Sequence, residues 1–308
     1  MRVYYCDHHE IPLPAGHKFP VRKYRMLREA LEGSGAPGHS CFDLQRAPFI
    51  SLEAVELAHD PAYVRAFVSG TLPAQAQRRI GFPWSQGLVD RTLASTGGTL
   101  EAARVALRQG MAGGLAGGTH HAFRDQGSGF CVFNDIAVAI RVLRHECRIR
   151  RAAVVDLDVH QGDGTAAIFA GDPDVLTFSM HGAHNFPFRK QRSSLDVELA
   201  DGVGDDEYLA RLEEVLPLVW AFSPEIVFYQ SGVDGLKTDR LGRLGLTHAG
   251  LRERDRMVFE GAKAHHLPLV ITLGGGYSEP IEATVEANAN TFLLAAGFQT
   301  TLQKDRGL

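Results

Sequence analysis

Short apolar runs that end in acidic, histidine or glycine-rich residues alternate with stretches of helical periodicity along this 308-residue chain. The best strand candidates are residues 152–157, 175–180, 225–230 and 267–273. Helices are predicted at residues 51–68, 89–109, 135–145, 207–220 and 251–265. This alternation is typical of a parallel sheet with helices on both faces. The sequence therefore predicts a three-layer α/β/α fold with a mostly parallel central sheet.

The length and composition suit one globular domain built around such a sheet. Hydrophobic residues make up 44% of the chain and charged residues 22%, as in folded globular proteins. This length would also allow two domains, but α/β enzymes of similar length often have one sheet, and no linker or repeat divides the sequence. We expect a single domain over residues 1–308, with a polar, frayed tail at 297–308.

Charge and cysteine content indicate the partners and the compartment. The net charge is −4 and the basic residues are mixed with acidic ones, so nucleic acid is not an expected partner. No apolar run approaches the roughly 18 to 20 residues that cross a bilayer, and the first ten residues do not resemble a signal peptide. The four cysteines form no Cys-x-x-Cys pair. These features predict a soluble cytoplasmic protein with reduced thiols and leave its oligomeric state open.

The run 152–157 continues into two acids and a histidine. Asp156, Asp158 and His160 are spaced two residues apart, and such residues point to the same side of an extended chain. Two carboxylates and an imidazole at the end of a buried strand are unfavourable unless a cation compensates their charge. A bound metal would supply that charge. The alternative is a solvated strand end whose acids cap the next helix.

Three further clusters follow apolar or glycine-rich segments. Asp234 follows the run 225–230, His120 and His121 follow a Gly-Gly pair, and Tyr277 follows three glycines. Taken alone, each has a structural interpretation: an Asp-Gly turn, one buried and one exposed histidine, or a packed tyrosine. Adjacent histidines suit two separate proton-handling roles better than one metal ion. A phenol on a glycine-rich turn can donate a hydrogen bond to an oxyanion.

Together the four clusters predict a catalytic metal centre. Two aspartates and a histidine form a three-ligand site with a free coordination position, which is typical of catalytic rather than structural zinc. The histidine pair and the tyrosine supply the acid–base groups and the oxyanion donor of metal-assisted amide hydrolysis. We know of no structural role that requires all four clusters.

The same motifs resemble those of the histone deacetylase superfamily, which includes acetylpolyamine and acetoin-utilisation proteins. Asp-x-Asp-x-His followed by Gly-Asp-Gly, with an upstream His-His and a downstream Gly-Gly-Gly-Tyr, is a specific set, and the matching segments run from His17 to Tyr277. Gln161, where many members carry a second histidine, makes the chain most similar to the class IV-like and bacterial branches. The resemblance implies the arginase/deacetylase fold. It also implies a zinc-dependent deacylase that hydrolyses acyl-lysine or a related acylated amine to free amine and carboxylate, with acetate the favoured product.

The resemblance also implies a role for each site residue. The zinc ligands would be Asp158, His160 and Asp234, with iron as an alternative metal. His121, paired with Asp163, would be the general base; His120, paired with Asp156, would tune the electrostatics; and Tyr277 would bind the scissile carbonyl and then the oxyanion. The predicted substrate-binding residues are Gly129, Phe130, Phe186, Phe188 and Gly275, with Phe130 on one wall of the acyl-lysine tunnel and either Phe186 or Phe188 on the other. A structural potassium ion would be held by Asp156, Asp158, His160, Ser179 and Met180.

Two departures from the family pattern leave the substrate open. Lys23 stands where many relatives have an arginine that lines the product channel. No residue is identified as the rim aspartate that holds the substrate backbone in eukaryotic deacetylases. Acylated lysine in a protein or peptide, small acylated amines such as acetylpolyamines, and acyl chains longer than acetyl all stay open as substrates.

Two other functions compete with deacylation. An arginase-like ureohydrolase with two manganese ions needs further bridging carboxylates, but the position two before Asp234 is Gly232. A non-catalytic protein that binds acyl-lysine would release no acetate, but every expected catalytic side chain is present. We therefore favour the deacylase.

Overall fold

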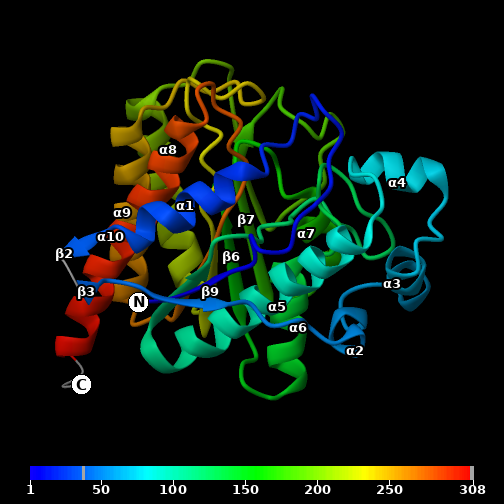
Figure 1. Cartoon of the computed structure of the whole chain (residues 1–308). Coiled ribbons are helices and arrows are strands. Elements are labelled where there is room, and N and C mark those ends of the chain that lie inside the picture. Colours follow the sequence, from blue (N-terminus) through cyan, green and yellow to red (C-terminus); the bar gives the residue numbers. More distant parts are fainter. Residues whose placement is uncertain (37–38, 306–308) are drawn as a thin grey trace.

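The main sheet of the protein has eight strands, all parallel, in the order β4-β1-β5-β10-β9-β6-β7-β8 (Figure 1). The computed structural model describes residues 1–36 and 39–305. The strands of the sheet are β1 (Arg2–Tyr5), β4 (Asp43–Arg46), β5 (Met111–Gly114), β6 (Ala152–Asp156), β7 (Val175–Gly182), β8 (Leu195–Leu199), β9 (Ile226–Gln230) and β10 (Leu269–Thr272). A separate antiparallel pair consists of β2 (Gly35–Ala36) and β3 (His39–Ser40). The predicted α/β fold with a parallel central sheet is confirmed.

Helices cover both faces of the sheet (Figure 1). One layer contains α2 (Leu52–Glu56), α3 (Pro61–Val68), α4 (Ala74–Ile80), α5 (Gln86–Gln109), α6 (Asp135–His145) and α7 (Asp163–Ile168). The opposite layer contains α1 (Arg22–Glu32), α8 (Asp205–Ala221), α9 (His248–Ala264) and α10 (Glu282–Asp305). The three-layer arrangement therefore agrees with the prediction.

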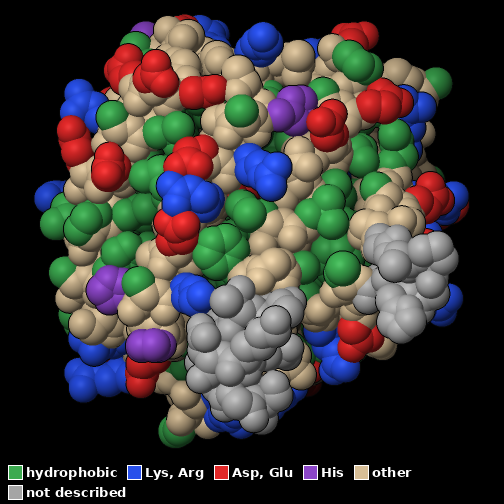
Figure 2. All heavy atoms as spheres, turned by 90° about the vertical axis from the view of Figure 1, so that its left-hand side faces the viewer, with side chains coloured by type: hydrophobic (Ala, Val, Ile, Leu, Met, Phe, Trp, Pro, Cys, Tyr) green, Lys and Arg blue, Asp and Glu red, His purple; other side chains and the backbone are tan. Residues whose placement is uncertain are grey.

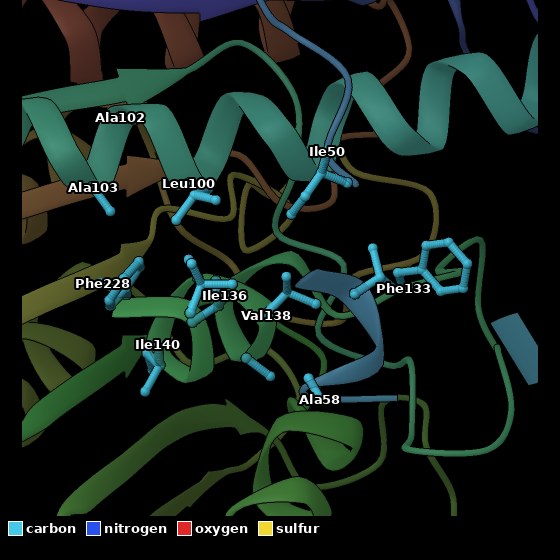
Figure 3. Close-up of a cluster of buried hydrophobic side chains, with 14 of the residues drawn as sticks. Ile50, Ala58, Leu100, Ala102, Ala103, Phe133, Ile136, Val138, Ile140 and Phe228 are labelled. Atoms are coloured by element: carbon cyan, nitrogen blue, oxygen red, sulfur yellow. The ribbon is translucent and has the colours of Figure 1, made fainter. Parts of the chain in front are cut away.

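Alternate residues of each central strand belong to two separate hydrophobic cores. Ala152 and Val154 of β6 belong to the core that includes residues of α5 and α6, whereas Ala153 and Val155 belong to the core that includes residues of α8 and α9. Figure 3 shows the first core, in which Ile136 of α6 lies close to Leu100 of α5. Because both faces are buried, the central strands are continuously apolar rather than alternating. That burial explains why these strands are recognisable in the sequence.

The predicted helix 51–68 is wrong as a single element, because the chain breaks between α2 and α3. Proline has no amide hydrogen, so Pro61 cannot continue a preceding helix but is well suited to the first turn of a new one. Asp60 caps α3, since its carboxylate accepts hydrogen bonds from the amides of Ala62 and Tyr63 at 2.7 and 3.3 Å. The other predicted helices and all four predicted strands are present with small differences at their ends. The sequence did not predict β1, β4, β5 or β8.

Helix α10 continues through most of the segment that the sequence predicts to be a frayed tail. It reaches Asp305, and residues 306–308 lie outside the described part of the chain. The face that contains this helix carries acidic and basic side chains that are interspersed (Figure 2). None of the helices in residues 1–36 and 39–305 combines the length and apolarity needed to cross a membrane.

Candidate active site

The four clusters predicted from the sequence meet at the carboxyl edge of the sheet. β5, β10, β9 and β6 are consecutive neighbours in the sheet, and all of them are parallel. Ligands of open α/β sheets bind beyond this edge. His120 and His121 follow β5, Tyr277 follows β10, Asp234 follows β9, and Asp158 and His160 follow β6. The strand order thus brings residues far apart in the sequence around one cavity of about 550 Å³.

Asp158, His160 and Asp234 form a candidate metal site. Their ligand atoms all lie within 4.8 Å of one another. The Nδ1 atom of His160 lies 3.0 Å from Asp158 Oδ1 and 2.9 Å from Asp234 Oδ2. Both aspartates are fully buried, and the side chain of His160 is 12% exposed. The convergence that the sequence predicted is therefore present in the structure.

This group of donors fits a divalent cation. The Oδ2 atom of Asp158 is buried and has no hydrogen-bond partner among the residues that the structure describes. Although burial opposes a charge on the imidazole, Asp234 and Asp158 raise the pKa of His160 to about 10. The two carboxylates thus favour a positive charge between them, and a metal ion would replace the proton on this nitrogen. One imidazole and two carboxylates are ligands that catalytic zinc accepts, with a position left for water or substrate.

Glycines leave the space that the ligand carboxylates occupy. A Cβ atom at Gly232 or Gly274 would lie 2.5 Å from Asp158 Oδ2. A Cβ atom at Gly275 would overlap the carboxylate of Asp234, and Gly275 also has a φ of +50°. The close approach and positive φ that the Gly-Gly-Gly run permits are both used here.

The two adjacent histidines have the carboxylate partners that were predicted. His120 Nδ1 lies 2.7 Å from Asp156 Oδ2, and His121 Nδ1 lies 2.7 Å from Asp163 Oδ1. Burial lowers the pKa of His121 well below its usual value, and the positive charge of neighbouring histidines lowers it further. Burial also lowers the pKa of His120, but the negative charges of Asp156 and Asp158 outweigh this effect and raise the pKa to about 9. Burial thus favours the neutral form of His121, whereas the two aspartates favour a proton on His120.

Aromatic side chains form the wall of the cavity next to these histidines. Tyr277 and Phe130 both line it, with ring centroids 6.2 Å apart. Burial raises the pKa of the Tyr277 phenol well above its usual value, so the hydroxyl keeps its proton. The ring of Phe186 lies 5.0 Å from that of His121, whereas Phe188 is 85% exposed. The structure thus distinguishes the two phenylalanines, with Phe186 inside the cavity and Phe188 at its mouth.

Lys23 is a buried cation beside the tyrosine loop. Its Nζ atom donates to the carbonyl oxygen of Gly276 at 3.1 Å and to that of Gly275. It also lies 5.0 Å from the centroid of the Tyr277 ring. Burial lowers the pKa of this ammonium to about 8. Lys23 therefore connects α1 to the loop that carries Tyr277, and it lines the cavity as the sequence suggested.

Two buried side chains that the sequence analysis missed fix the loops around the site. The carboxylate of Asp239 accepts a hydrogen bond from the amide of Tyr277 at 2.6 Å. Arg254 of α9 is fully buried, donates to the carbonyl of Gly232 at 2.5 Å and pairs with Asp255 at 2.7 Å. Both residues lie in charged runs typical of a solvated surface, so no local pattern marks them. Only the tertiary structure reveals their contacts.

The residues predicted to hold potassium lie on adjacent strands or directly after one of them. Asp156 of β6 is in register with Ser179 of β7, and both side chains are buried. Asp156 Oδ1 accepts from the amide of Asp158 at 3.1 Å, while Ser179 Oγ lies 3.0 Å from His181 Nδ1. The potassium ion stays a prediction.

Known proteins of similar sequence and structure identify the family. Residues 17–293 match the histone deacetylase domain. The chain is 46% identical to an uncharacterized protein of Picosynechococcus sp. over 287 residues, which cover 92% of this chain and 94% of that protein. It is 32% identical to the histone deacetylase-like amidohydrolase of Pseudomonas aeruginosa over 285 residues, which cover 87% of this chain and 74% of that protein.

A solved structure shows the same fold. The crystal structure of an HDAC homolog from Aquifex aeolicus matches 96% of this chain and 84% of that chain, with a TM-score of 0.81 and 23% identity. Because 96% of this chain is covered, the match includes the sheet and both helical layers. The family match over most of the chain and this likeness of fold lead to one conclusion. The chain belongs to the histone deacetylase family and has the arginase/deacetylase fold.

Proposed function

We propose that this protein is a zinc-dependent deacylase that hydrolyses the amide of an acylated amine to the free amine and a carboxylate. The observation that carries the proposal is the shared cavity: the candidate metal ligands, the neutral His121 and the protonated Tyr277 all line it or adjoin it. The name of the Pseudomonas aeruginosa relative, an amidohydrolase, supports the same reaction class. We further propose that the chain forms one catalytic domain and acts in the cytoplasm, since its four cysteines are free thiols.

Asp158, His160 and Asp234 would hold the zinc ion, with Fe²⁺ as the alternative. Potassium would be held by Asp156, Asp158, His160, Ser179 and Met180. A bound zinc ion would polarise the scissile carbonyl and bring the pKa of water near 7. The acyl-bearing side chain would lie between Phe130 and Phe186. Gly129 leaves this part of the cavity free, because a Cβ there would lie 2.9 Å from the ring of His121 and 3.2 Å from that of Phe186.

The histidine pair would move the protons of the reaction. Nδ1 of His121 is bound to Asp163, so Nε2 is the atom that accepts a proton from the attacking water and delivers it to the departing amine nitrogen. His120, paired with Asp156, would tune the electrostatics of the site, and a positive charge on it would favour the neutral form of His121. The hydroxyl of Tyr277 would donate a hydrogen bond to the oxyanion. In comparable sites such a donor lowers the activation free energy by about 2.7–4 kcal/mol.

A mononuclear site favours this reaction over the arginase-like alternative. The candidate ligand group contains three residues, one imidazole and two carboxylates, without a further bridging acid in the group. Two metal ions would need additional carboxylates between them.

A deacylation assay with and without chelator tests the proposal. The purified protein is expected to release acetate from an acetyl-lysine peptide, to lose this activity after chelation and to regain it with zinc. The His121→Ala variant is expected to keep its metal and its affinity for a hydroxamate inhibitor but to turn over slowly. Turnover that survives complete metal removal, or stoichiometric peptide binding without acetate release, contradicts the proposal.

A further inference from the structure

The mouth of the cavity carries positive charges and apolar side chains. Phe188, 85% exposed, and Leu241, 39% exposed, form its apolar part. Arg79 and Arg243 also line the cavity and are exposed. Lys190 lies next to the cavity lining: its Nζ atom donates to the carbonyl oxygen of Asn185, which lines the cavity, at 2.6 Å and to that of Pro187 at 2.7 Å.

Negative charge is scarce around this opening. Of the described residues that line the cavity, Asp158 is the one carboxylate, and it is buried at the candidate metal site. Two carboxylates of the described chain bond to the mouth. Asp201 already binds Arg243 and His184 at 3.2 Å each, and the buried Asp239 accepts from the amide of Leu241 at 2.8 Å. Arg79 donates to the neutral side chain of Gln126. The local balance at the mouth is therefore positive, although the whole chain has a net charge of −4.

The positive charge at the mouth affects which acylated amines can bind. In acetylputrescine, the free ammonium is separated from the amide by the same number of methylene groups as Cα is in acetyl-lysine. With the amide at the metal site, that ammonium would reach the mouth at the level where a lysine residue has its neutral backbone. It would lose hydration against Phe188 and Leu241 and would be repelled by the arginines. Acidic groups at the same place would instead be attracted.

We propose that this deacylase acts on acylated amines whose carrier is neutral or anionic next to the amide, such as acyl-lysine in a neutral or acidic peptide, and selects against polyamines and lysine-rich segments. This inference rests on the proposed deacylase function. It assigns Arg79 and Arg243 as residues that determine specificity through charge. Charges at a rim chiefly change association rates and salt dependence, and both can be measured.

The test compares kcat/KM for four acetylated substrates at low and high ionic strength. These are a neutral capped acetyl-lysine peptide, the same peptide with flanking Glu, the same peptide with flanking Arg, and acetylputrescine. We expect the acidic peptide to be favoured over the basic one by about tenfold or more at low salt, with acetylputrescine at or below the basic peptide. The differences should shrink at high salt, since screening weakens interactions between exposed charges.

Charge reversal at the mouth supplies the decisive variant. Arg79→Glu combined with Arg243→Glu is expected to reverse the ratio between acidic and basic peptides. Arg211→Glu, an exposed site on α8 that does not line the cavity, is the matched control and should leave the ratio unchanged. Because each ratio is taken within one variant, a general loss of activity cancels. A kcat/KM for acetylputrescine equal to or above that of the neutral peptide, or ratios that charge reversal does not move, overturns the selectivity alone. No turnover of any substrate refutes the proposed function.

Discussion

Replacement of Gly275 by alanine tests the metal site without altering any ligand. A Cβ at this position would overlap the Asp234 carboxylate and lie 2.7 Å from the Asp234 Cβ, whereas contacts under 3.0 Å require a shift. Asp234 is fully buried, and its Oδ1 atom is held by the amide of Val159 at 2.9 Å. The carboxylate would therefore have to move by about 1 Å or more, because nonbonded heavy atoms prefer separations of about 3.5 to 4.0 Å.

The expected loss of metal affinity follows from that displacement. Ligand distances in metal sites vary by only about 0.2 Å, so a shift of about 1 Å removes Asp234 from the coordination sphere. Loss of an outer partner of a ligand costs about 10- to 100-fold in affinity, so we expect Gly275→Ala to weaken zinc binding by at least about 100-fold. The positive φ adds a backbone cost of about 1–2 kcal/mol to the stability of the protein.

Gly171→Ala separates these two effects. Gly171 has a φ of +77°, and a Cβ added there would meet no described atom within 4 Å, so this variant has the backbone cost alone. Competition with a chromophoric chelator measures zinc affinity, and thermal unfolding of the metal-free proteins measures stability. Gly171→Ala should lose the stability that the backbone cost alone removes, Gly275→Ala should lose more because of the overlap with Asp234, and only Gly275→Ala should lose zinc. Equal zinc affinity in the two variants would refute the assignment of Asp234 as a ligand.

Three further predictions concern side chains around the cavity. Tyr277→Phe should lose about two to three orders of magnitude in kcat while retaining zinc, because it removes one oxyanion donor; single-turnover kinetics and metal analysis check this, and a loss below about threefold contradicts it. Burial lowers the pKa of Lys23 from 10.5 to about 8, so between these values the unfolded chain holds a proton that the folded chain has released, and stability should rise with pH. The free energy of unfolding of the wild type should therefore increase relative to that of Lys23→Met between pH 8 and pH 10, and a constant difference in denaturant titrations excludes the shift. Asp239→Asn should lower kcat more than metal affinity, since its carboxylate holds the amide of Tyr277; parallel measurement of both quantities checks this, and equal losses would indicate a general structural defect.

The chemistry of the site could be predicted from the sequence because it lies where buried strands end. Strand β6 is apolar up to Asp156 because both of its faces are buried. The acids and the histidine that follow at every second residue, Asp156, Asp158 and His160, therefore stand out in the sequence. The break between α2 and α3 also has a local signal, since an aspartate directly before Pro61 is a common start of a helix. The apolar periodicity on either side of this break outweighed that signal in the prediction of one helix.

Other features depend on tertiary contacts that no local pattern reveals. β5 has the sequence Met-Ala-Gly-Gly, without the β-branched residues typical of strands, yet it positions the histidine loop. Phe186 and Phe188 alternate in the same segment, and only the packing of Phe186 on His121 distinguishes them. Arg254 is buried because strand-end carbonyls and Asp255 surround it, although its helix is highly charged.

Metal analysis of the purified protein tests the central claim most directly. Elemental analysis of the wild type, Asp158→Ala, Asp234→Ala and His121→Ala, each dialysed against zinc and then against buffer, gives the metal content per chain. We predict about one zinc per chain for the wild type and for His121→Ala, and less than about one tenth of that for the two aspartate variants, because removing one of three ligands abolishes tight binding. Full zinc content in either aspartate variant, or two metal ions per chain in the wild type, would contradict the three-ligand site.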